Sequence, residues 1–190
     1  MKKLSLISVA LLYLFSTPCF SQNDTIWFDL NWKETSKKNA AFYRPEPKKK
    51  GDAYYLVDYY LNGAKQMEGV SNDPKEDFYN GRVSWYHENG NIFQTANYDK
   101  NVLNGNRKVY FENGKLKSES SYLDGKLHGK WKEYYDNETI KATGSYENGQ
   151  KEGVWRTYYI NGKLFETGRY VFDHKVDEWK TNYYDGSEQN

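Results

Sequence analysis

The sequence predicts an all-β fold: an elongated single-layer antiparallel sheet of stacked β-hairpin repeats with a 24-residue period and an N-terminal cap. The first observation is this period, because a fixed spacing of about 20 to 50 residues is typical of repeat architectures. Two of its columns are Gly81, Gly105, Gly129, Gly153 and Tyr98, Tyr122, Tyr146, Tyr170. The second observation is that each period holds two short alternating segments joined by Asn-Gly or an equivalent pair, which is a strong hairpin signal.

The amino-acid composition predicts how apolar side chains are buried and which charged partners are excluded. The chain has 19 Tyr, 6 Trp and 9 Phe, whereas long aliphatic runs are absent after residue 21. We therefore expect aromatic faces to be buried in a thin layer rather than in a thick aliphatic core. The 27 basic residues nearly balance the 26 acidic ones. This balance argues against bulk electrostatic binding to nucleic acid, so no nucleic-acid partner is expected.

Residues 1–21 are typical of a secretory signal peptide. Two lysines precede an apolar run at 4–15, and Ser21 supplies the small residue before a cut. A membrane anchor is the alternative, but this run is shorter than the ~20 residues that span a bilayer. A lipoprotein cysteine at Cys19 is a second alternative, although the proline before it fits that motif poorly. We expect export to the periplasm, the outer membrane or the medium, with a mature chain that begins at Gln22.

The segment 22–52 does not follow the repeat. Residues 25–30 and 41–44 have strand composition, and Pro45 stops the second segment. The run 48–51 is predicted to be a solvated turn, because it consists of three lysines and a glycine. We interpret the whole segment as an N-terminal cap, since an open repeat array has to cover its first edge.

The repeat domain occupies residues 53–190. Its first copy is irregular, because Gly63 and Gly90 are 27 residues apart, and we place the three-residue insertion within 71–75. The copies that follow are 82–105, 106–129, 130–153, 154–177 and a truncated 178–190.

The hairpin register follows if each Asn-Gly forms a two-residue type I′ turn. In the 130–153 copy, Trp131 then faces Gly144 and Tyr134 pairs with Lys141, while Tyr135 faces Ile140. Tryptophan opposite glycine lets the indole lie flat across the neighbouring strand. The alternative is that these glycines are only turn or bulge residues. Small residues hold this position in five copies: Gly69, Ala96, Ser120, Gly144 and Gly168.

The segment 154–168, VWRTYYINGKLFETG, resembles the MORN-repeat family, in the variant found in bacterial YwqK-type antitoxin-like proteins. The resemblance covers about residues 55–186. It implies a single layer of stacked hairpins that serves as a non-enzymatic scaffold. It also implies a protein partner, in an antitoxin or immunity role for the antitoxin-like members.

Motifs for catalysis, phosphate binding or metal binding are absent from the sequence. The three histidines occupy different places in the repeat, and the acidic group of Asp73, Glu76 and Asp77 is interpreted as solvated charge. We expect no enzyme activity, no cofactor and no metal site. An enzyme would require a cleft between the cap and the first hairpins.

One pattern indicates a binding face. A basic column and a tyrosine column are predicted to share one side of the sheet, with Phe93 and Phe165 across from two of the tyrosines. Their residues are Lys108, Lys132, Arg156, Lys180 and Tyr86, Tyr110, Tyr134, Tyr158. Alternating cations and rings suit a protein partner, or alternatively an envelope glycan or anionic lipid. The other alternative is that lysine stems cover the tyrosine rings and keep an open sheet soluble.

Overall fold

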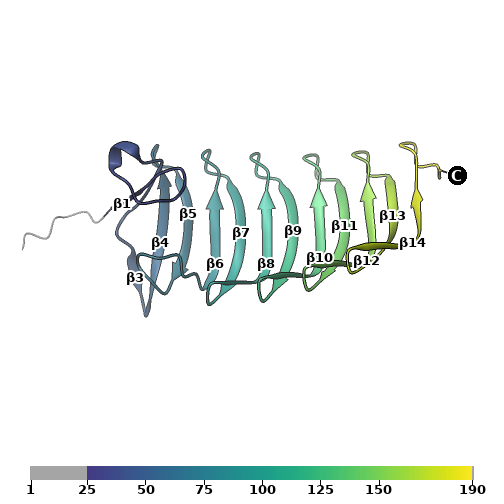
Figure 1. The fold of residues 1–190 in the computed structure, drawn as a ribbon. Helices are drawn as coiled ribbons and strands as arrows, with labels where there is room; N and C mark the ends of the chain where they lie inside the picture. Colours follow the sequence, from purple (N-terminus) through teal and green to yellow (C-terminus); the bar gives the residue numbers. More distant parts are fainter. Residues whose placement is uncertain (1–24, 190) are drawn as a thin grey trace, which may run out of the picture.

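The structure is a computed structural model that describes residues 25–189. It is one open antiparallel sheet of 14 strands in the order β1-β2-β4 to β14, with β3 paired to β4 (Figure 1). The predicted single-layer all-β fold is confirmed. The predicted signal peptide lies outside the described residues. Within 25–189, no helix is long and apolar enough to cross a bilayer.

The strands fall into a cap, five hairpins and a final strand. The cap contains β1 (Ile26–Phe28), the 3-10 helix η1 (Lys37–Asn39), β2 (Phe42–Arg44) and β3 (Lys48–Lys50). The hairpins are β4 (Ala53–Tyr60) with β5 (Lys65–Ser71), β6 (Gly81–Tyr86) with β7 (Ile92–Asp99), β8 (Val102–Tyr110) with β9 (Leu116–Leu123), β10 (Lys126–Tyr134) with β11 (Ile140–Glu147) and β12 (Gln150–Tyr158) with β13 (Leu164–Val171). The final strand is β14 (His174–Thr181).

The lysine run of the cap is a strand, so the prediction of a solvated turn was wrong there. Lys48, Lys49 and Lys50 pair with the start of β4, and the chain reverses at 51–52 instead, where Gly51 has a φ of 63°. All three lysines are exposed. A short edge strand covered with lysine resists pairing with other chains, which explains why three consecutive charges are tolerated in a strand.

The turns at the hairpin tips are not type I′. Only the second residue of each Asn-Gly pair has a positive φ, as at Gly162 (81°), and Glu138 adopts the same conformation (68°). The amide of Glu138 donates to the carbonyl of Tyr135 (3.0 Å). This is a type I turn followed by a left-handed residue. Type I′ turns form at the other end of the sheet, where consecutive residues such as Asn148 (51°) and Gly149 (92°) both have positive φ.

This turn changes the pairing at the tip and leaves the rest of the predicted register intact. Trp131 pairs with Gly144 as predicted, but a bulge follows, and Tyr134 lies opposite Ile140 instead of Lys141. The predicted Tyr135–Ile140 pair was therefore wrong. The predicted neighbours of the two phenylalanines were wrong for the same reason. The Phe93 ring packs against His87 (5.1 Å) and the Phe165 ring against Tyr159 (5.0 Å), rather than against the tyrosine column.

The glycines opposite tryptophan make room for the indole of the next repeat. A Cβ added to Gly144 would lie 2.2 Å from Trp155, and one on Gly168 would lie 2.2 Å from Trp179. Each indole thus lies over the preceding hairpin and not, as predicted, over its own partner strand. The stacking makes a continuous aromatic layer, in which the Trp131 and Trp155 ring centroids are 5.3 Å apart.

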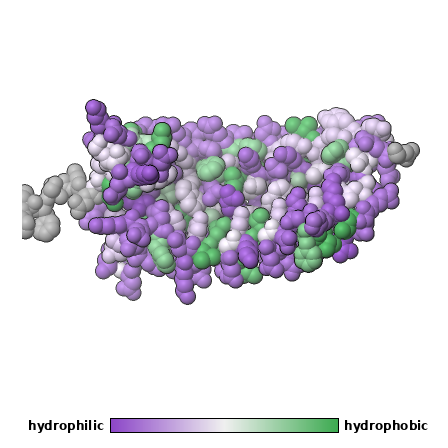
Figure 2. Space-filling model, viewed as in Figure 1, coloured by the Kyte–Doolittle hydropathy of each residue, from purple (hydrophilic) through white to green (hydrophobic). Residues whose placement is uncertain are grey.

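The strands bend at the glycine column that ends each repeat. Gly129 has a φ of 89°, and the pairing of β10 with β9 shifts register between Leu127 and Trp131. An extra residue in one strand of a pair is a bulge, which bends that strand. Figure 1 shows that strands such as β7 and β9 are curved. The surface in Figure 2 is mostly hydrophilic and carries small separate hydrophobic patches.

The deepest packing lies at the N-terminal end. Leu56, Met67 and Val83 are at most 1% exposed, and Tyr79 covers them. This aliphatic cluster departs from the predicted thin aromatic layer, which describes the later repeats only. The loop 72–80 between β5 and β6, which contains most of the predicted insertion, contributes Tyr79 to this cluster, and the Tyr79 hydroxyl contacts the Met67 sulfur (3.9 Å).

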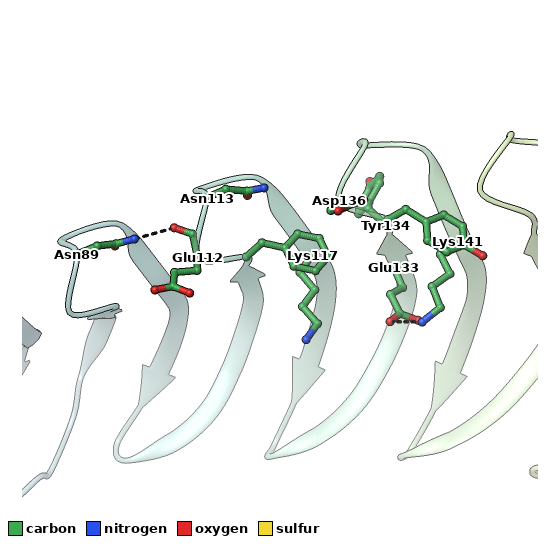
Figure 3. A pocket seen from close by; sticks show the side chains of 10 residues that line it. Asn89, Glu112, Asn113, Lys117, Glu133, Tyr134, Asp136 and Lys141 are labelled. Atoms are coloured by element: carbon green, nitrogen blue, oxygen red, sulfur yellow. Dashed lines mark hydrogen bonds and ion pairs between the residues drawn. The ribbon is translucent and has the colours of Figure 1, made fainter.

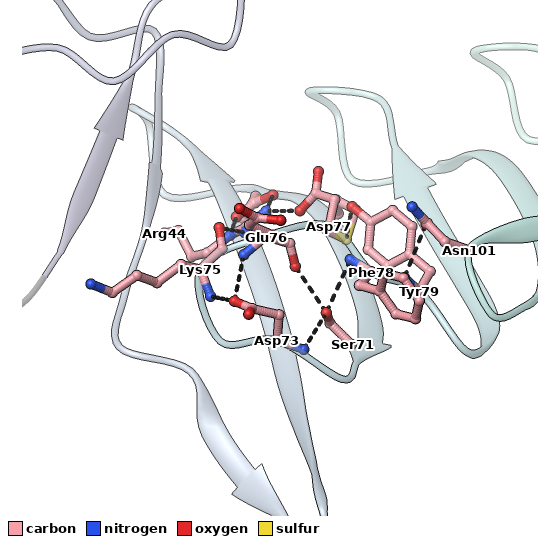
Figure 4. A network of polar contacts seen from close by, with 11 residues as sticks. Arg44, Ser71, Asp73, Lys75, Glu76, Asp77, Phe78, Tyr79 and Asn101 are labelled. Carbon is pink, nitrogen blue, oxygen red and sulfur yellow. Dashed lines mark hydrogen bonds and ion pairs between the residues drawn. The ribbon is translucent and has the colours of Figure 1, made fainter.

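A buried ion-pair network holds the insertion in place (Figure 4). The Arg44 guanidinium donates to both carboxylate oxygens of Asp58 (2.6 and 2.8 Å) and to Asp77 (2.7 Å). Arg44 and Asp58 are each 1% exposed. The interpretation of Asp77 as merely solvated charge was therefore wrong. The sequence carries no local sign of this pairing, because Arg44 lies in the cap, 33 residues away.

Candidate functional site

The predicted basic and tyrosine columns lie together on one face of the sheet, and we call them the Lys/Tyr row. Their members are Lys108, Lys132, Arg156, Lys180, Tyr86, Tyr110, Tyr134 and Tyr158. Lys108 and Lys132 both lie opposite Glu119, one on each side of it. The Glu119 carboxylate contacts the Lys132 ammonium (3.4 Å) and accepts from the Tyr134 hydroxyl (2.9 Å). A basic and a tyrosine member of the row thus share one carboxylate.

A second carboxylate binds the first tyrosine of the row. Glu68 accepts hydrogen bonds from Tyr55, Tyr86 and the Lys65 ammonium, the last at 2.6 Å. Burial opposes ionisation, but these three donors outweigh it and lower the pKa of Glu68 to about 2. Burial, together with the bond to Glu68, raises the pKa of Tyr86 to about 12. The hydroxyl therefore stays protonated near neutral pH and is committed to Glu68.

The row alternates between neutralised and free positions. Lys132 is paired with Glu119, and Lys180 with Glu188 (3.1 Å). Lys108 and Arg156 form no ion pair within the described part of the chain. Each of these two cations lies opposite a threonine, Thr95 for Lys108 and Thr143 for Arg156. Glu119 also lies opposite Lys108, but its carboxylate contacts Lys132 instead.

Sequence reasoning missed this alternation. The signal was present as a further column, in which Glu119 stands 24 residues from both Thr95 and Thr143. Read together with the basic column, it predicts a carboxylate beside Lys108 and Lys132 and none opposite Arg156. It also distinguishes Tyr134, whose hydroxyl is bound to Glu119, from Tyr110 and Tyr158.

Two shallow hollows meet at Lys108. One of about 260 Å³ also includes Lys130, Lys132 and Ser121, and one of about 350 Å³ includes Arg82 and Tyr110. Asn106 lines both. Side-chain amides, hydroxyls and cations predominate, with Glu119 as the single carboxylate in the two linings. Arg82 and Lys130 were also missed, although they stand 24 residues on either side of Asn106 in a column of their own.

Comparison with family models assigns the repeats. The model of the MORN repeat variant matches residues 79–100, 103–124, 127–148 and 151–171. Residues 79–171 of the chain form MORN-variant repeats. The predicted MORN-variant repeat is confirmed there, and this repeat family is a non-catalytic scaffold. A search of the curated proteins finds no match. In this MORN-variant protein the sheet continues beyond the matched repeats, with β4 and β5 before them and β14 after them.

The tips of the MORN-variant hairpins are tied together by side chains. The turn asparagine donates to a carbonyl of the next tip: Asn137 to Ile160 (3.1 Å) and Asn161 to Tyr184 (3.1 Å). The tyrosine two residues earlier does the same, as Tyr135 donates to the Tyr158 carbonyl (2.8 Å). The asparagine of Asn-Gly therefore stacks repeats and closes its own turn, and it does not supply a positive φ.

A cleft between the cap and the first hairpins is also present, with a volume of about 650 Å³. Its lining includes Trp27, Tyr54, Glu34, Glu46 and Lys75. The lining contains no histidine, cysteine or serine. Among residues 25–189, no group of three His, Cys, Asp or Glu side chains is placed to hold a metal ion.

Proposed function

We propose that this MORN-variant protein is an exported, non-enzymatic scaffold that binds an acidic segment of a protein partner through the Lys/Tyr row. The observation that carries the proposal is the pair of free cations, Lys108 and Arg156, set in a row whose other two basic members are neutralised. Cations held next to hydroxyls and amides favour carboxylate ligands. An antitoxin or immunity role, in which the partner is a toxin of the envelope, is the specific form of this function.

The geometry favours an extended partner segment. Lys108 and Arg156 lie on β8 and β12, four strands apart. At the spacing of neighbouring strands, this separates them by about 19 Å. No single carboxylate spans that distance, whereas an extended peptide does so in about six residues. Each exposed contact is weak, so affinity comes from several contacts acting together and falls as salt rises.

The first experiment identifies the partner and tests the row together. Mature protein is used to capture partners from envelope extract, and binding is then measured for Lys108→Glu with Arg156→Glu. We expect at least a tenfold loss, because reversing two charges converts attraction into repulsion. The matched control is Lys50→Glu with Lys126→Glu, which makes the same change in net charge at exposed positions outside the row. Full affinity of the row variant at low salt would overturn the proposal.

Export is tested separately by mass spectrometry of protein from its native host. We expect a chain that begins at Gln22, because Ser21 precedes the proposed cut. A full-length chain in the cytoplasm would contradict both the signal peptide and the proposed location, while leaving the row itself unaffected.

An envelope glycan or anionic lipid is the second candidate ligand. The observation in its favour is that the ring of Tyr110 lines the same hollow as Lys108 and Arg82. A half-buried ring next to cations suits the sugar acids of envelope polymers. Sedimentation with vesicles containing phosphatidylglycerol, and with vesicles of neutral lipid as the control, distinguishes this ligand from a protein.

A further inference from the structure

The side-chain links between hairpin tips are interrupted at one step of the array, between the β8–β9 tip and the β10–β11 tip. Phe111 occupies the position of Tyr135 and Tyr159, but it has no hydroxyl to donate. The side-chain NH2 of Asn113 donates no hydrogen bond among the described residues, although its oxygen accepts one from the Lys115 amide (3.0 Å). The corresponding groups on both sides do donate: Asn89 to the Glu112 carbonyl (3.0 Å) and Asn137 to the Ile160 carbonyl (3.1 Å).

Two backbone acceptors are left open by this interruption. The carbonyls of Tyr134 and Asp136 correspond to those of Tyr158 and Ile160, which accept the tyrosine and asparagine bonds one repeat later. Within the described residues, neither the Tyr134 nor the Asp136 carbonyl receives a side-chain hydrogen bond. At this step the two tips are joined instead by an exposed ion pair between Lys115 and Glu138 (3.6 Å).

A hollow of about 740 Å³, which we call the tip hollow, lies at this step (Figure 3). One side is lined by Phe111, Glu112, Asn113 and Lys117 of the β8–β9 hairpin. The other side is lined by residues of the β10–β11 hairpin, namely Glu133, Tyr134, Tyr135, Asp136 and Lys141. The interruption of the tip links and the hollow thus coincide.

The chemistry of the tip hollow favours a cation that donates several hydrogen bonds. Its lining contains three carboxylates and two ammonium groups, and one pair is neutralised because Lys141 binds Glu133 (3.0 Å). Glu112 and Asp136 form no ion pair in the described part of the chain. Two of its three rings already attract cations: the ammonium of Lys117 lies 5.6 Å from the Phe111 centroid, and that of Lys141 lies 6.0 Å from the Tyr135 centroid. The hollow is therefore rich in acceptors and in ring faces.

We propose that the tip hollow binds an arginine side chain of a partner protein. A guanidinium carries five donors in a planar fork, so it bonds carboxylates and carbonyls together, and it stacks on aromatic faces. A lysine ammonium lacks both the fork and the flat face. The occupant would supply donors to the Tyr134 carbonyl and the Asp136 carboxylate, in place of the missing tyrosine hydroxyl. This site adjoins the Lys/Tyr row, because Tyr134 belongs to both, but it attracts the opposite charge.

The test is an NMR titration of the mature protein with N-acetyl-arginine amide. The neutral isostere N-acetyl-citrulline amide is the control ligand, because it has nearly the same shape and no charge. We expect shifts at Phe111, Tyr135 and Asp136 with the arginine probe, and affinity at least about tenfold weaker with citrulline, as for loss of a charge-assisted hydrogen bond. Equal binding of the two probes would overturn the proposal. Preferential binding of methyl cellobioside at these residues would also overturn it, in favour of a sugar site.

Two variants locate the site. Phe111→Tyr adds the hydroxyl that donates to the next tip from Tyr60, Tyr135 and Tyr159. It should therefore link the two tips, leave the melting temperature unchanged or higher, and weaken binding of the arginine probe about tenfold. Glu112→Gln should weaken binding of the arginine probe by a similar factor. Glu88→Gln, at the equivalent position of the preceding tip, should leave that binding unchanged. Retention of full affinity by both Phe111→Tyr and Glu112→Gln would contradict the assignment.

Discussion

The two ends of the sheet are built on different principles. From the cap to β7, side chains are buried beneath the 72–80 loop, and Arg44, Leu56 and Asp58 are at most 1% exposed. From β8 onward a single layer of rings lies on the strands, and Trp155 (4%) is one of its few buried residues. The difference shows that stacking alone makes a thin layer. A deeper core requires a segment from outside the repeat to cover the face.

The largest expected effect is at the N-terminal end. Arg44→Ala leaves Asp58 buried without its partner, which should cost about 3 to 5 kcal/mol in the free energy of unfolding. Denaturant melts provide the measurement. The double variant Arg44→Met with Asp58→Leu is the control, because replacing both members removes the unpaired charge and should restore most of the loss. A double variant as unstable as Arg44→Ala would show that shape, and not charge, matters at this position.

The matching change in the thin layer is Trp155→Ala. We expect a cost of about 3 kcal/mol, the low end for loss of a buried tryptophan, because no second layer covers the ring. Since repeats contact only their neighbours, protection from hydrogen exchange should fall in β10 to β14 and remain high in β4 to β6. Uniform loss of protection along the sheet would mean that the two ends unfold as one unit.

Gly144→Ala tests the packing between repeats. Its Cβ would lie 2.2 Å from the indole of Trp155, so the ring must move, and we expect a cost of about 1 to 3 kcal/mol by denaturant melt. Gly149→Ala is a poor control because its φ is positive, whereas Ser120→Ala, in the same column as Gly144, has a side chain already and should cost less. If Gly144→Ala left the free energy of unfolding unchanged, the Trp155 indole could not lie against Gly144.

Acid should act on the N-terminal end through Glu68. Its pKa in the folded state, about 2, is below the ordinary 4.5, so its contribution to stability is complete above about pH 4.5 and is lost as pH falls toward 2. The Glu68→Gln variant should therefore be less stable than the native chain at pH 7. This difference in stability should become smaller as pH falls from 4.5 to 2. Thermal melts across this range test the expectation. If the difference in stability did not change with pH, the effect of the substitution would come from packing and not from the charge of Glu68.

The smallest expected effect is on the Lys/Tyr row. Lys132→Ala should change the free energy of unfolding by at most about 0.5 kcal/mol, because its contact with Glu119 is half exposed (41% and 32%). The melt is compared with that of Trp155→Ala on the opposite face. If Lys132→Ala proved the more destabilising of the two, the assignment of the faces would be reversed.

The candidate site could be predicted in part. The 24-residue spacing placed Lys108 and Arg156 in one row, because identical stacked units must align their equivalent residues. The spacing could not show which cations are free, because Glu119 lies opposite both Lys108 and Lys132, and only the side-chain contact shows that it binds Lys132. The tip hollow also escaped prediction. Its cause, the absence of a hydroxyl at Phe111, becomes visible only when the bond from Tyr135 to the next tip is known.

The sequence by itself determined the repeat, the antiparallel hairpins and the pairing of Trp131 with Gly144, because a period and an alternation of side chains define these features locally. Only the tertiary structure decided the turn types: Asn161-Gly162 is a type I turn with a left-handed glycine, while Asn148-Gly149 is type I′. The dipeptide permits both. The choice depends on how the two strands that the turn joins are paired, which the dipeptide does not encode. For the same reason the Arg44 network could not be predicted, because contacts between segments distant in the chain produce no periodic pattern in the sequence.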